Sequence, residues 1–390
     1  MSFLRAARAA LAGQNCLPQI LVAVVAVVVL AGLSLSCGSS HSTSGHNHSA
    51  YVTLPARGSV LLLHINGATG AITLGAETPQ VQNTSPTGIA LLPSKKFLYA
   101  VNSSSHADSI SIFNVASDGT LALSGTPTPA GAGPNDAVID PSGKYLLVTN
   151  NFGNNVSVYS IDASSGALSE VAGSPFPANN NPAEILITPS GRFVYVTNPG
   201  IGMVTAFSFS NGVLTQLPTS PVSSGAGAFG LAVDGSEQFL YVANPSASNP
   251  PPSSTRGNIS GFTITSNGAL TPILGSPFTV TNGNGPSAVT VDPSGKYVYA
   301  TTPGSSFSIW CFTITPANGQ LVAVTNSPFS LTAGGLFALF DPSGNYLYIG
   351  SQDANGIAGY TYDPSTGAPT AIAGSPFSTV AAPGKMVLSE

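Results

Sequence analysis

One phrase of about ten residues recurs along the chain and constrains how it can fold. Two full copies are PSGKYLLVTN, which ends at Asn150, and PSGRFVYVTN, which ends at Asn198. Further copies end at Asn102, Asn244, Thr302 and Ser351, and a truncated copy, AYVTL, ends at Leu54. Successive copies end 46 to 58 residues apart, so residues 50–390 hold seven units. Such a period predicts one small structural unit per copy, stacked on its neighbours.

Each unit is expected to form four strands. In the unit that contains PSGRFVYVTN the predicted strands are Glu184–Thr188, Phe193–Thr197, Met203–Phe209 and Val213–Gln216. They are short, rich in β-branched and aromatic residues, and bounded by Pro, Gly, Asn and Ser. Several are apolar without alternation, as a sheet covered on both faces requires. The sequence therefore predicts an all-β fold, a seven-bladed β-propeller with four-stranded blades.

The two ends of the repeat region predict how the ring closes. The region begins at the second strand of a unit, Ala50 to Thr53, and ends with an unpartnered first strand, Lys385 to Ser389. Pairing of this C-terminal strand with the N-terminal blade would complete the ring and remove an exposed sheet edge.

Several aspartates of the repeat are best explained as turn residues. Asp140, Asp292 and Asp341 each begin an Asp-Pro-Ser-Gly turn, and Asp234 holds the same place in a degenerate copy. Asp at the first position, Pro at the second and Gly at the fourth are preferences of a type I turn. We therefore exclude these carboxylates from the catalytic candidates.

The composition excludes some functions. Asp, Glu, Lys and Arg make up 6% of the residues, against roughly 25% in ordinary soluble domains. With 10 Lys and Arg and a net charge of −5, no basic surface can neutralise a row of phosphates, so nucleic acid is excluded as a partner. The glycine-rich segment 225–230 leads into a predicted strand rather than a helix, so it is no dinucleotide site. We expect neither a cofactor nor a bound metal.

The first residues are typical of an export signal. Arg5 and Arg8 precede the apolar run Ile20 to Leu35, and Cys37 follows. Leu33 to Cys37 resembles the lipobox of bacterial lipoproteins, although Ser34 and Leu35 depart from its pattern. The resemblance implies acylation of Cys37. We expect an export signal at 1–36, a flexible tether at 37–49 and the propeller at 50–390, in the periplasm or at the cell surface, held to the membrane only by lipid.

The Tyr-Val-Thr-Asn and Ser-Pro-Phe repeats resemble those of the seven-bladed propeller family that includes bacterial 6-phosphogluconolactonases and fungal muconate-lactonising enzymes. The resemblance implies lactone chemistry. Enzymes of this family carry a Gly-Pro-Arg-His-like motif before the turn, and its Arg and His are associated with the active site. No copy here has His at that position, which is occupied around the ring by Gly88, Asp136, Glu184, Gly230, Ala288, Phe337 and Lys385.

Three of those seven residues are charged and form the candidate catalytic site. Asp136 or Glu184 could act as a general base toward water, and Lys385 could stabilise an oxyanion. The alternative is a solvated or salt-bridged rim. His106 is a further catalytic candidate, and the candidate binding residues are Asn135, Asp108 and Arg256.

Two functions remain open. The first is a monomeric ligand-binding or interaction module at the cell envelope, which takes a small polar ligand such as a lactone or glycan. The alternative is a lactone hydrolase that uses Asp136 or Glu184 as general base. An enzyme predicts that the charged side chains converge around one cavity. A binding module predicts that they point apart into solvent.

Overall fold

The computed structural model describes residues 47–80, 84–103, 108–245, 257–280, 285–303, 308–331, 334–351 and 353–389. This part is all-β, with one 3-10 turn, η1 (Pro55–Arg57). Within it, no helix has the length and apolar character needed to span a membrane. The export signal, Cys37, His106 and Arg256 lie outside the described residues.

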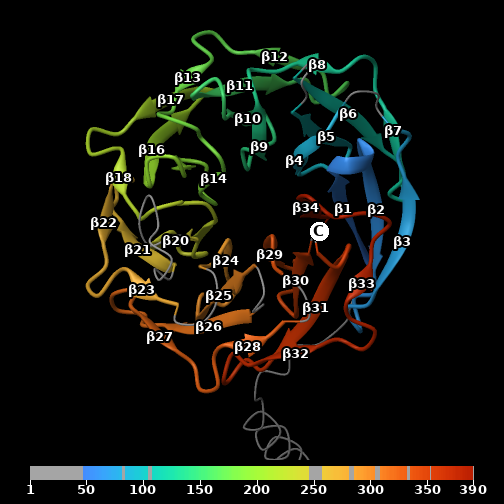
Figure 1. Cartoon of the computed structure of the whole chain (residues 1–390). Helices are drawn as coiled ribbons and strands as arrows, with labels where there is room; N and C mark the ends of the chain where they lie inside the picture. Colours follow the sequence, from blue (N-terminus) through green and yellow to red (C-terminus); the bar gives the residue numbers. More distant parts are fainter. Residues whose placement is uncertain are drawn as a thin grey trace, which may run out of the picture. The chain divides into compact units, whose positions relative to one another are not determined.

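Seven antiparallel sheets stand around a common centre, as predicted (Figure 1). We number the blades along the chain from the sheet that contains residue 50. The innermost strands of blades 1 to 7 are β34 (Met386–Leu388), β4 (Pro86–Leu91), β9 (Pro134–Ile139), β14 (Ile185–Ile187), β19 (Leu231–Val233), β24 (Ala288–Val291) and β29 (Phe337–Phe340).

The remaining strands follow outward in the same blade order. The second strands are β1 (His48–Leu54), β5 (Phe97–Asn102), β10 (Tyr145–Asn150), β15 (Phe193–Asn198), β20 (Phe239–Asn244), β25 (Tyr297–Thr302) and β30 (Tyr346–Ser351). The third strands are β2 (Ser59–Ile65), β6 (Ser109–Val115), β11 (Asn155–Ile161), β16 (Met203–Ser210), β21 (Asn258–Ile264), β26 (Ser308–Ile314) and β31 (Gly356–Tyr362). The fourth strands are β3 (Ile72–Glu77), β7 (Leu121–Leu123), β12 (Leu168–Glu170), β17 (Val213–Gln216), β22 (Leu270–Pro272), β27 (Leu321–Ala323) and β32 (Pro369–Ala371).

Blades 2 to 7 carry a fifth, two-residue strand that the sequence analysis did not anticipate. Each pairs with the first two residues of the third strand, and each begins at the residue that follows a Ser-Pro or Thr-Pro dipeptide. They are β8 (Thr128–Pro129), β13 (Phe176–Pro177), β18 (Val222–Ser223), β23 (Phe278–Thr279), β28 (Phe329–Ser330) and β33 (Phe377–Ser378).

The ring closes by the predicted pairing of the chain ends. In blade 1, Val52 pairs with Met386 and Ala50 with Leu388, so β34 is the innermost strand beside β1. β1 begins at His48, two residues inside the segment expected to be tether, because the β1–β2 ladder continues to a pair between His48 and Ile65. No free edge remains at the centre of blade 1.

Adjacent blades are held together by a recurring hydrogen bond. The buried tyrosine of the second strand donates its hydroxyl to a glycine carbonyl in the hairpin between the third and fourth strands of the next blade. The six pairs are Tyr51 with Gly119, Tyr99 with Gly166, Tyr195 with Gly268, Tyr241 with Gly319, Tyr299 with Gly367 and Tyr348 with Gly70, at 2.8–2.9 Å. Blade 3 has Leu147 at this position, so its joint with blade 4 lacks the bond.

The turn aspartates behave as predicted. Asp140 is buried, and its Oδ1 accepts the backbone N–H groups of Lys144 and Tyr145 at 2.8 and 2.7 Å. Asp234, Asp292 and Asp341 form the same turns in their blades. Their acceptor capacity serves the backbone, which removes them from catalysis.

Candidate functional site

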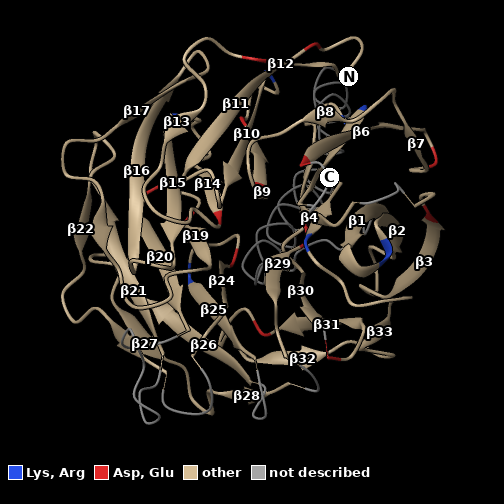
Figure 2. Cartoon of the chain, turned by 45° about the horizontal axis from the view of Figure 1, so that its top comes forward, with Lys and Arg blue, Asp and Glu red and all other residues tan. Residues whose placement is uncertain are grey.

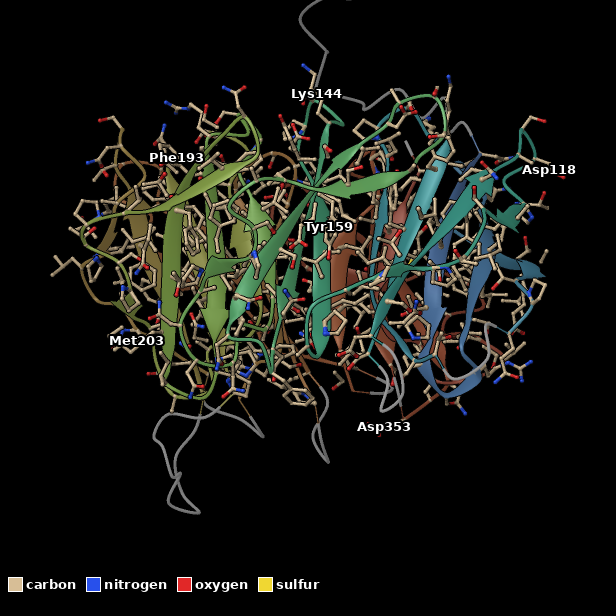
Figure 3. The ribbon with its side chains drawn as sticks, turned by 90° about the horizontal axis from the view of Figure 1, so that it is seen from above. Asp118, Lys144, Tyr159, Phe193, Met203 and Asp353 are labelled. Atoms are coloured by element: carbon tan, nitrogen blue, oxygen red, sulfur yellow. The ribbon has the colours of Figure 1, made fainter. Side chains whose placement is uncertain are left out.

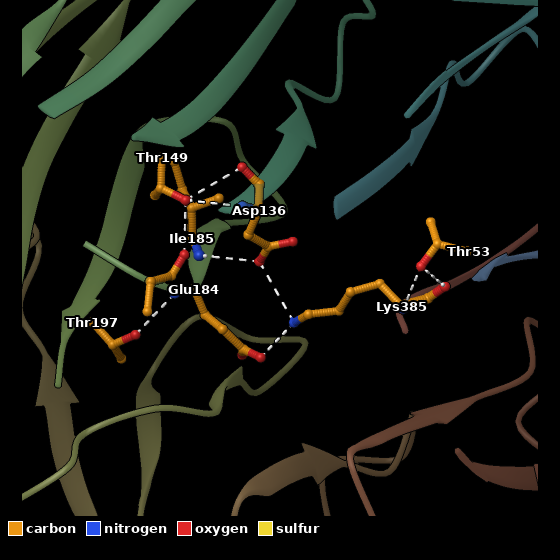
Figure 4. A network of polar contacts seen from close by, with 8 residues as sticks. Thr53, Asp136, Thr149, Glu184, Ile185, Thr197 and Lys385 are labelled. Carbon is orange, nitrogen blue, oxygen red and sulfur yellow. Dashed lines mark hydrogen bonds and ion pairs between the residues drawn. The ribbon is translucent and has the colours of Figure 1, made fainter. Parts of the chain in front are cut away.

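Three charged side chains meet at the centre of the ring, where the innermost strands begin (Figure 4). The Lys385 ammonium forms an ion pair with Glu184 Oε1 and lies 3.7 Å from Asp136 Oδ2. Lys385 precedes β34 of blade 1, whereas Asp136 lies on β9 of blade 3 and Glu184 precedes β14 of blade 4. The lysine therefore reaches across the centre to two neighbouring blades on the far side. The three side chains converge as ion pairs, an arrangement that the salt-bridged alternative also predicts.

A threonine of the repeated Tyr-Val-Thr-Asn phrase fixes the backbone of each charged residue. The hydroxyls of Thr53, Thr149 and Thr197 accept the backbone N–H groups of Lys385, Asp136 and Glu184, at 2.8, 3.0 and 3.1 Å respectively. β14 is Ile185–Ile187, one residue shorter at each end than the predicted strand Glu184–Thr188.

Thr149 connects the two acidic blades. Its hydroxyl also donates to the carbonyl of Ala183 at 2.7 Å, the residue before Glu184. In the reverse direction, the N–H of Ile185 donates to Asp136 Oδ2 at 3.3 Å. The spacing of the two carboxylates is thus set by backbone contacts on both sides.

Gly88 holds the equivalent position in blade 2, between Lys385 and Asp136 around the ring. A Cβ at Gly88 would lie 2.8 Å from the Cα of Asp136. No side chain fits at residue 88 unless β4 or β9 moves, so the close approach of these two strands requires glycine in blade 2.

The cluster is largely buried and carries one negative charge in excess. The side chains of Asp136, Glu184 and Lys385 are 11, 14 and 23% exposed, so water retains access to them. Burial raises the pKa of Glu184; Lys385 lowers it and Asp136 raises it, and the net shift is upward. Burial disfavours the ammonium of Lys385, but the two carboxylates outweigh it and the pKa of Lys385 is raised.

Of the other predicted residues, Asp108 and Asn135 lie in the described part of the chain. Asp108 Oδ2 accepts the N–H of Gly133 at 2.7 Å, so it anchors the loop that leads into β9. Asn135 is half-buried on β9 beside Asp136. The roles predicted for His106 and Arg256 concern residues outside the described part and stay predictions.

The three threonines are the part of the site that sequence reasoning missed. The signal for them is the repeated phrase itself, since each is the threonine of a Tyr-Val-Thr-Asn copy or its truncated form. Each threonine therefore has two roles: it is part of a strand of the sheet, and its hydroxyl binds the backbone of a charged residue of the cluster.

Charged residues are sparse elsewhere in the ring (Figure 2). Among the described residues, no three His, Cys, Asp or Glu side chains are grouped so as to hold a metal ion. Two pockets lie on blade 1, away from the cluster; one includes Ser49 and His64, and the other lies beside the ion pair of Arg57 with Glu77.

Comparison with known proteins gives one family. The chain matches the family model described as lactonase, 7-bladed beta-propeller, over residues 36–176, 171–251 and 255–384. No curated protein matches.

Two solved structures illustrate the likeness in fold. A protein named as a 6-phosphogluconolactonase from Bacteroides fragilis is 20% identical, with a TM-score of 0.73 over 90% of this chain and 99% of that one. A periplasmic gluconolactonase from Pseudomonas aeruginosa is 18% identical, with a TM-score of 0.70 over 88% and 99%. At these identities the likeness concerns the fold.

Proposed function

The chain belongs to the seven-bladed β-propeller lactonase family, and from this premise we propose that it is a lactone hydrolase whose site is the cluster of Asp136, Glu184 and Lys385. The observation that carries the proposal is the convergence of two carboxylates and one ammonium, drawn from three blades, at the centre of the ring. A salt-bridged rim without catalysis would show the same ion pairs, so the rate of lactone hydrolysis by Glu184→Gln distinguishes the two.

The chemistry follows from the charges. A carboxylate takes a proton from water while the water oxygen attacks the lactone carbonyl. The Lys385 ammonium faces the oxygen that becomes negative and stabilises it. The tetrahedral intermediate then expels the ring oxygen, which receives the proton back from the carboxyl group. The C–O bond is broken and the product is a hydroxy acid.

Glu184 is the better general base of the two carboxylates. Burial raises its pKa above the ordinary carboxyl value, which strengthens it as a proton acceptor. Asp136 is bound by the N–H of Ile185 and faces the lysine at 3.7 Å, so its role is to hold Lys385 charged and in place. An ammonium has three N–H donors. The two carboxylates occupy at most two of them, which leaves a donor for the substrate carbonyl.

The test is hydrolysis of a panel of five- and six-membered lactones by the full chain, followed in a pH-stat. Glu184→Gln is expected to lower kcat on the order of 10²- to 10⁴-fold. The matched control is Glu170→Gln: Glu170 is exposed on β12 and contacts Ser174 at 2.8 Å, so its loss should leave the rate unchanged. Absence of turnover across the panel, or full activity of Glu184→Gln, would contradict the proposal and return the ligand-binding module to first place.

Export and lipid anchoring at Cys37 form part of the same proposal. Support comes from the basic start, the apolar run and the lipobox-like sequence, and the similar Pseudomonas aeruginosa protein is periplasmic. Labelling of cells with a fatty-acid analogue should mark the wild-type chain and not Cys37→Ser. Equal labelling of both, or of neither, would refute the anchor.

A further inference from the structure

Two loops of blades 3 and 4, the blades that carry Asp136 and Glu184, contain several amide side chains and one exposed aromatic ring. We define the Asn–Phe platform as residues 151–154, between β10 and β11, and residues 179–181, which precede β14. It contains Asn151, Asn154, Asn179, Asn180, Asn181 and Phe152. β10 ends opposite the start of β9, since Asn150 pairs with Pro134, so the platform lies on the face of the ring where Asp136 and Glu184 lie.

Phe152 is unusual for its exposure. Its side chain is 73% exposed, and it is the single aromatic residue among the large, strongly exposed hydrophobic residues of the described part. The ring lies over Gly133, where a Cβ would come within 2.5 Å of it. The neighbouring loop, which precedes Met203, contributes a second exposed hydrophobic residue, Ile201, whose side chain is 39% exposed. Figure 3 shows Met203 on the face of the ring opposite Lys144. Phe152 lies between Asn151 and Asn154 in the chain, so one loop presents an apolar ring beside amide groups.

The amides are held in fixed positions by bonds between the two loops. The N–H of Asn181 donates to Asn154 Oδ1 at 2.9 Å, and Asn181 Nδ2 donates to Asn151 Oδ1 at 3.3 Å. Asn151 Nδ2 donates to the carbonyl of Pro182 at 3.2 Å. The backbone of Asn151 is bound to Gly133 at 2.7 Å. Since the platform is ordered before any ligand arrives, binding loses little conformational entropy.

The side chains of the platform indicate which class of ligand it can bind. Residues 149–155 and 177–182 contain no Asp, Glu, Lys or Arg, so nothing here would pair with a phosphate or carboxylate. An asparagine side chain carries two N–H donors and an oxygen acceptor, which match hydroxyl groups that donate and accept together. On the platform, Asn180 is exposed and presents such a side chain. A flat, exposed ring matches the apolar C–H face of a sugar ring. An apolar peptide or lipid would need a larger hydrophobic surface than one ring and its neighbour.

We propose that the Asn–Phe platform binds uncharged oligosaccharides, with Phe152 stacked on one sugar ring and Asn180, which is exposed, bound to its hydroxyls. The platform is separate from the cluster of Asp136, Glu184 and Lys385, so this inference holds whether or not that cluster hydrolyses lactones.

The experiment is titration calorimetry of the full chain with neutral hexasaccharides: cellohexaose, mannohexaose, xylohexaose and chitohexaose. At least one is expected to bind, with affinity lowered 10-fold or more in Phe152→Ala and restored in Phe152→Trp. Asn180→Ala should weaken the same ligand severalfold. Leu274→Ala is the matched control, since Leu274 is 82% exposed on blade 5, between β22 and β23.

Two outcomes would overturn the inference: no binding of any hexasaccharide at millimolar concentration, or equal affinity of Phe152→Ala and wild type. Because both substitutions are at exposed positions, an unchanged melting temperature is expected to accompany them. Glu184→Gln should bind as wild type does. A loss of lactone turnover in that variant therefore separates the two proposals.

Discussion

Lys385 and Glu184 lie 201 residues apart in the chain, and their side chains form an ion pair across the centre of the ring. The pair exists because β34 returns to blade 1, which brings the last residues of the chain opposite blade 4. The strand that closes the ring therefore also supplies the lysine of the charged cluster, and substitutions can separate what each contributes to stability.

Lys385→Met should destabilise the protein at neutral pH. Removal of one partner leaves two largely buried carboxylates facing each other, which costs about 3 kcal/mol in the free energy of unfolding. Without the ammonium, the already raised pKa of Glu184 rises further. A folded state with a raised carboxyl pKa binds protons more tightly than the unfolded chain, so the deficit grows as pH rises above about 4.5.

Urea unfolding from pH 4 to 8 measures this deficit. Lys385→Met/Glu184→Gln removes one of the facing charges and should recover most of the loss. A deficit that is equal at pH 4 and pH 8 would show that the lysine acts by packing and not by charge.

Thr149→Val should lower kcat for a lactone more than it changes KM, by about tenfold. The buried hydroxyl accepts from the N–H of Asp136 and donates to Ala183, so its loss lets the two acids shift apart. Thr149→Ser keeps the hydroxyl and should restore kcat.

Thr301→Val is the control for that substitution. Thr301 is equally buried and holds the same place in blade 6, where the residue at the centre is Ala288. Its loss should have a comparable structural cost, about 1–3 kcal/mol, without the effect on kcat. Equal loss of kcat in both variants would assign Thr149 to the fold alone.

A chain that ends at residue 384 should melt about 10 °C lower than the full chain, or fail to fold. It lacks β34, its three residue pairs with β1 and the Lys385 ammonium. A chain shortened by two residues keeps β34 and is expected to melt within a few degrees of the full length. An unchanged melting midpoint for the chain ending at 384 would refute closure by this strand.

Stability should fall steeply above pH 10. Burial, with a smaller contribution from Asp118, raises the pKa of Tyr51 to about 12, and the other five tyrosines that bridge blades are shifted in the same direction. The unfolded chain loses these phenolic protons near pH 10 while the folded protein retains them. With six such groups the slope approaches a limit of roughly 8 kcal/mol per pH unit once the phenols of the unfolded chain are fully ionised.

Thermal melts at pH 8 to 11.5 test this dependence. Tyr195→Phe removes one titrating group and should give a shallower decline above pH 10, despite a lower stability at pH 8. A melting temperature that stays level to pH 11.5 would show that these phenols titrate normally in the folded state.

The fold could be predicted because each copy of the repeat carries its own strand and turn chemistry. The Asp-Pro-Ser-Gly turns and the unalternating strands specify the blade, and the incomplete units at the two ends specify closure. The start of β1 and the length of β14 could not be predicted. The start of β1 depends on a residue distant in the chain, because His48 pairs with Ile65.

The charged cluster could be predicted in part. Asp136, Glu184 and Lys385 hold the same position in their repeats. Because the blades are arranged around one centre, residues at that repeat position all lie near the centre of the ring. Which side chains touch depends on residues at the other positions, such as Gly88, and on the reach of a lysine across the centre. The binding roles of the loops could not be read from the repeat, because loops are where the copies differ.

The joint between blades 3 and 4 is the one that lacks a tyrosine-to-glycine bond, because Leu147 stands in the tyrosine's place. Asp136 and Glu184 lie on opposite sides of that joint. The joint is held instead by apolar packing, because Leu147 lies in a buried cluster with Val194 and Phe207 of blade 4. Near its inner end it is also held by Thr149, the N–H of Ile185 and the shared lysine. A substitution at Leu147 would therefore act on the joint that positions the two acids, without touching either of them.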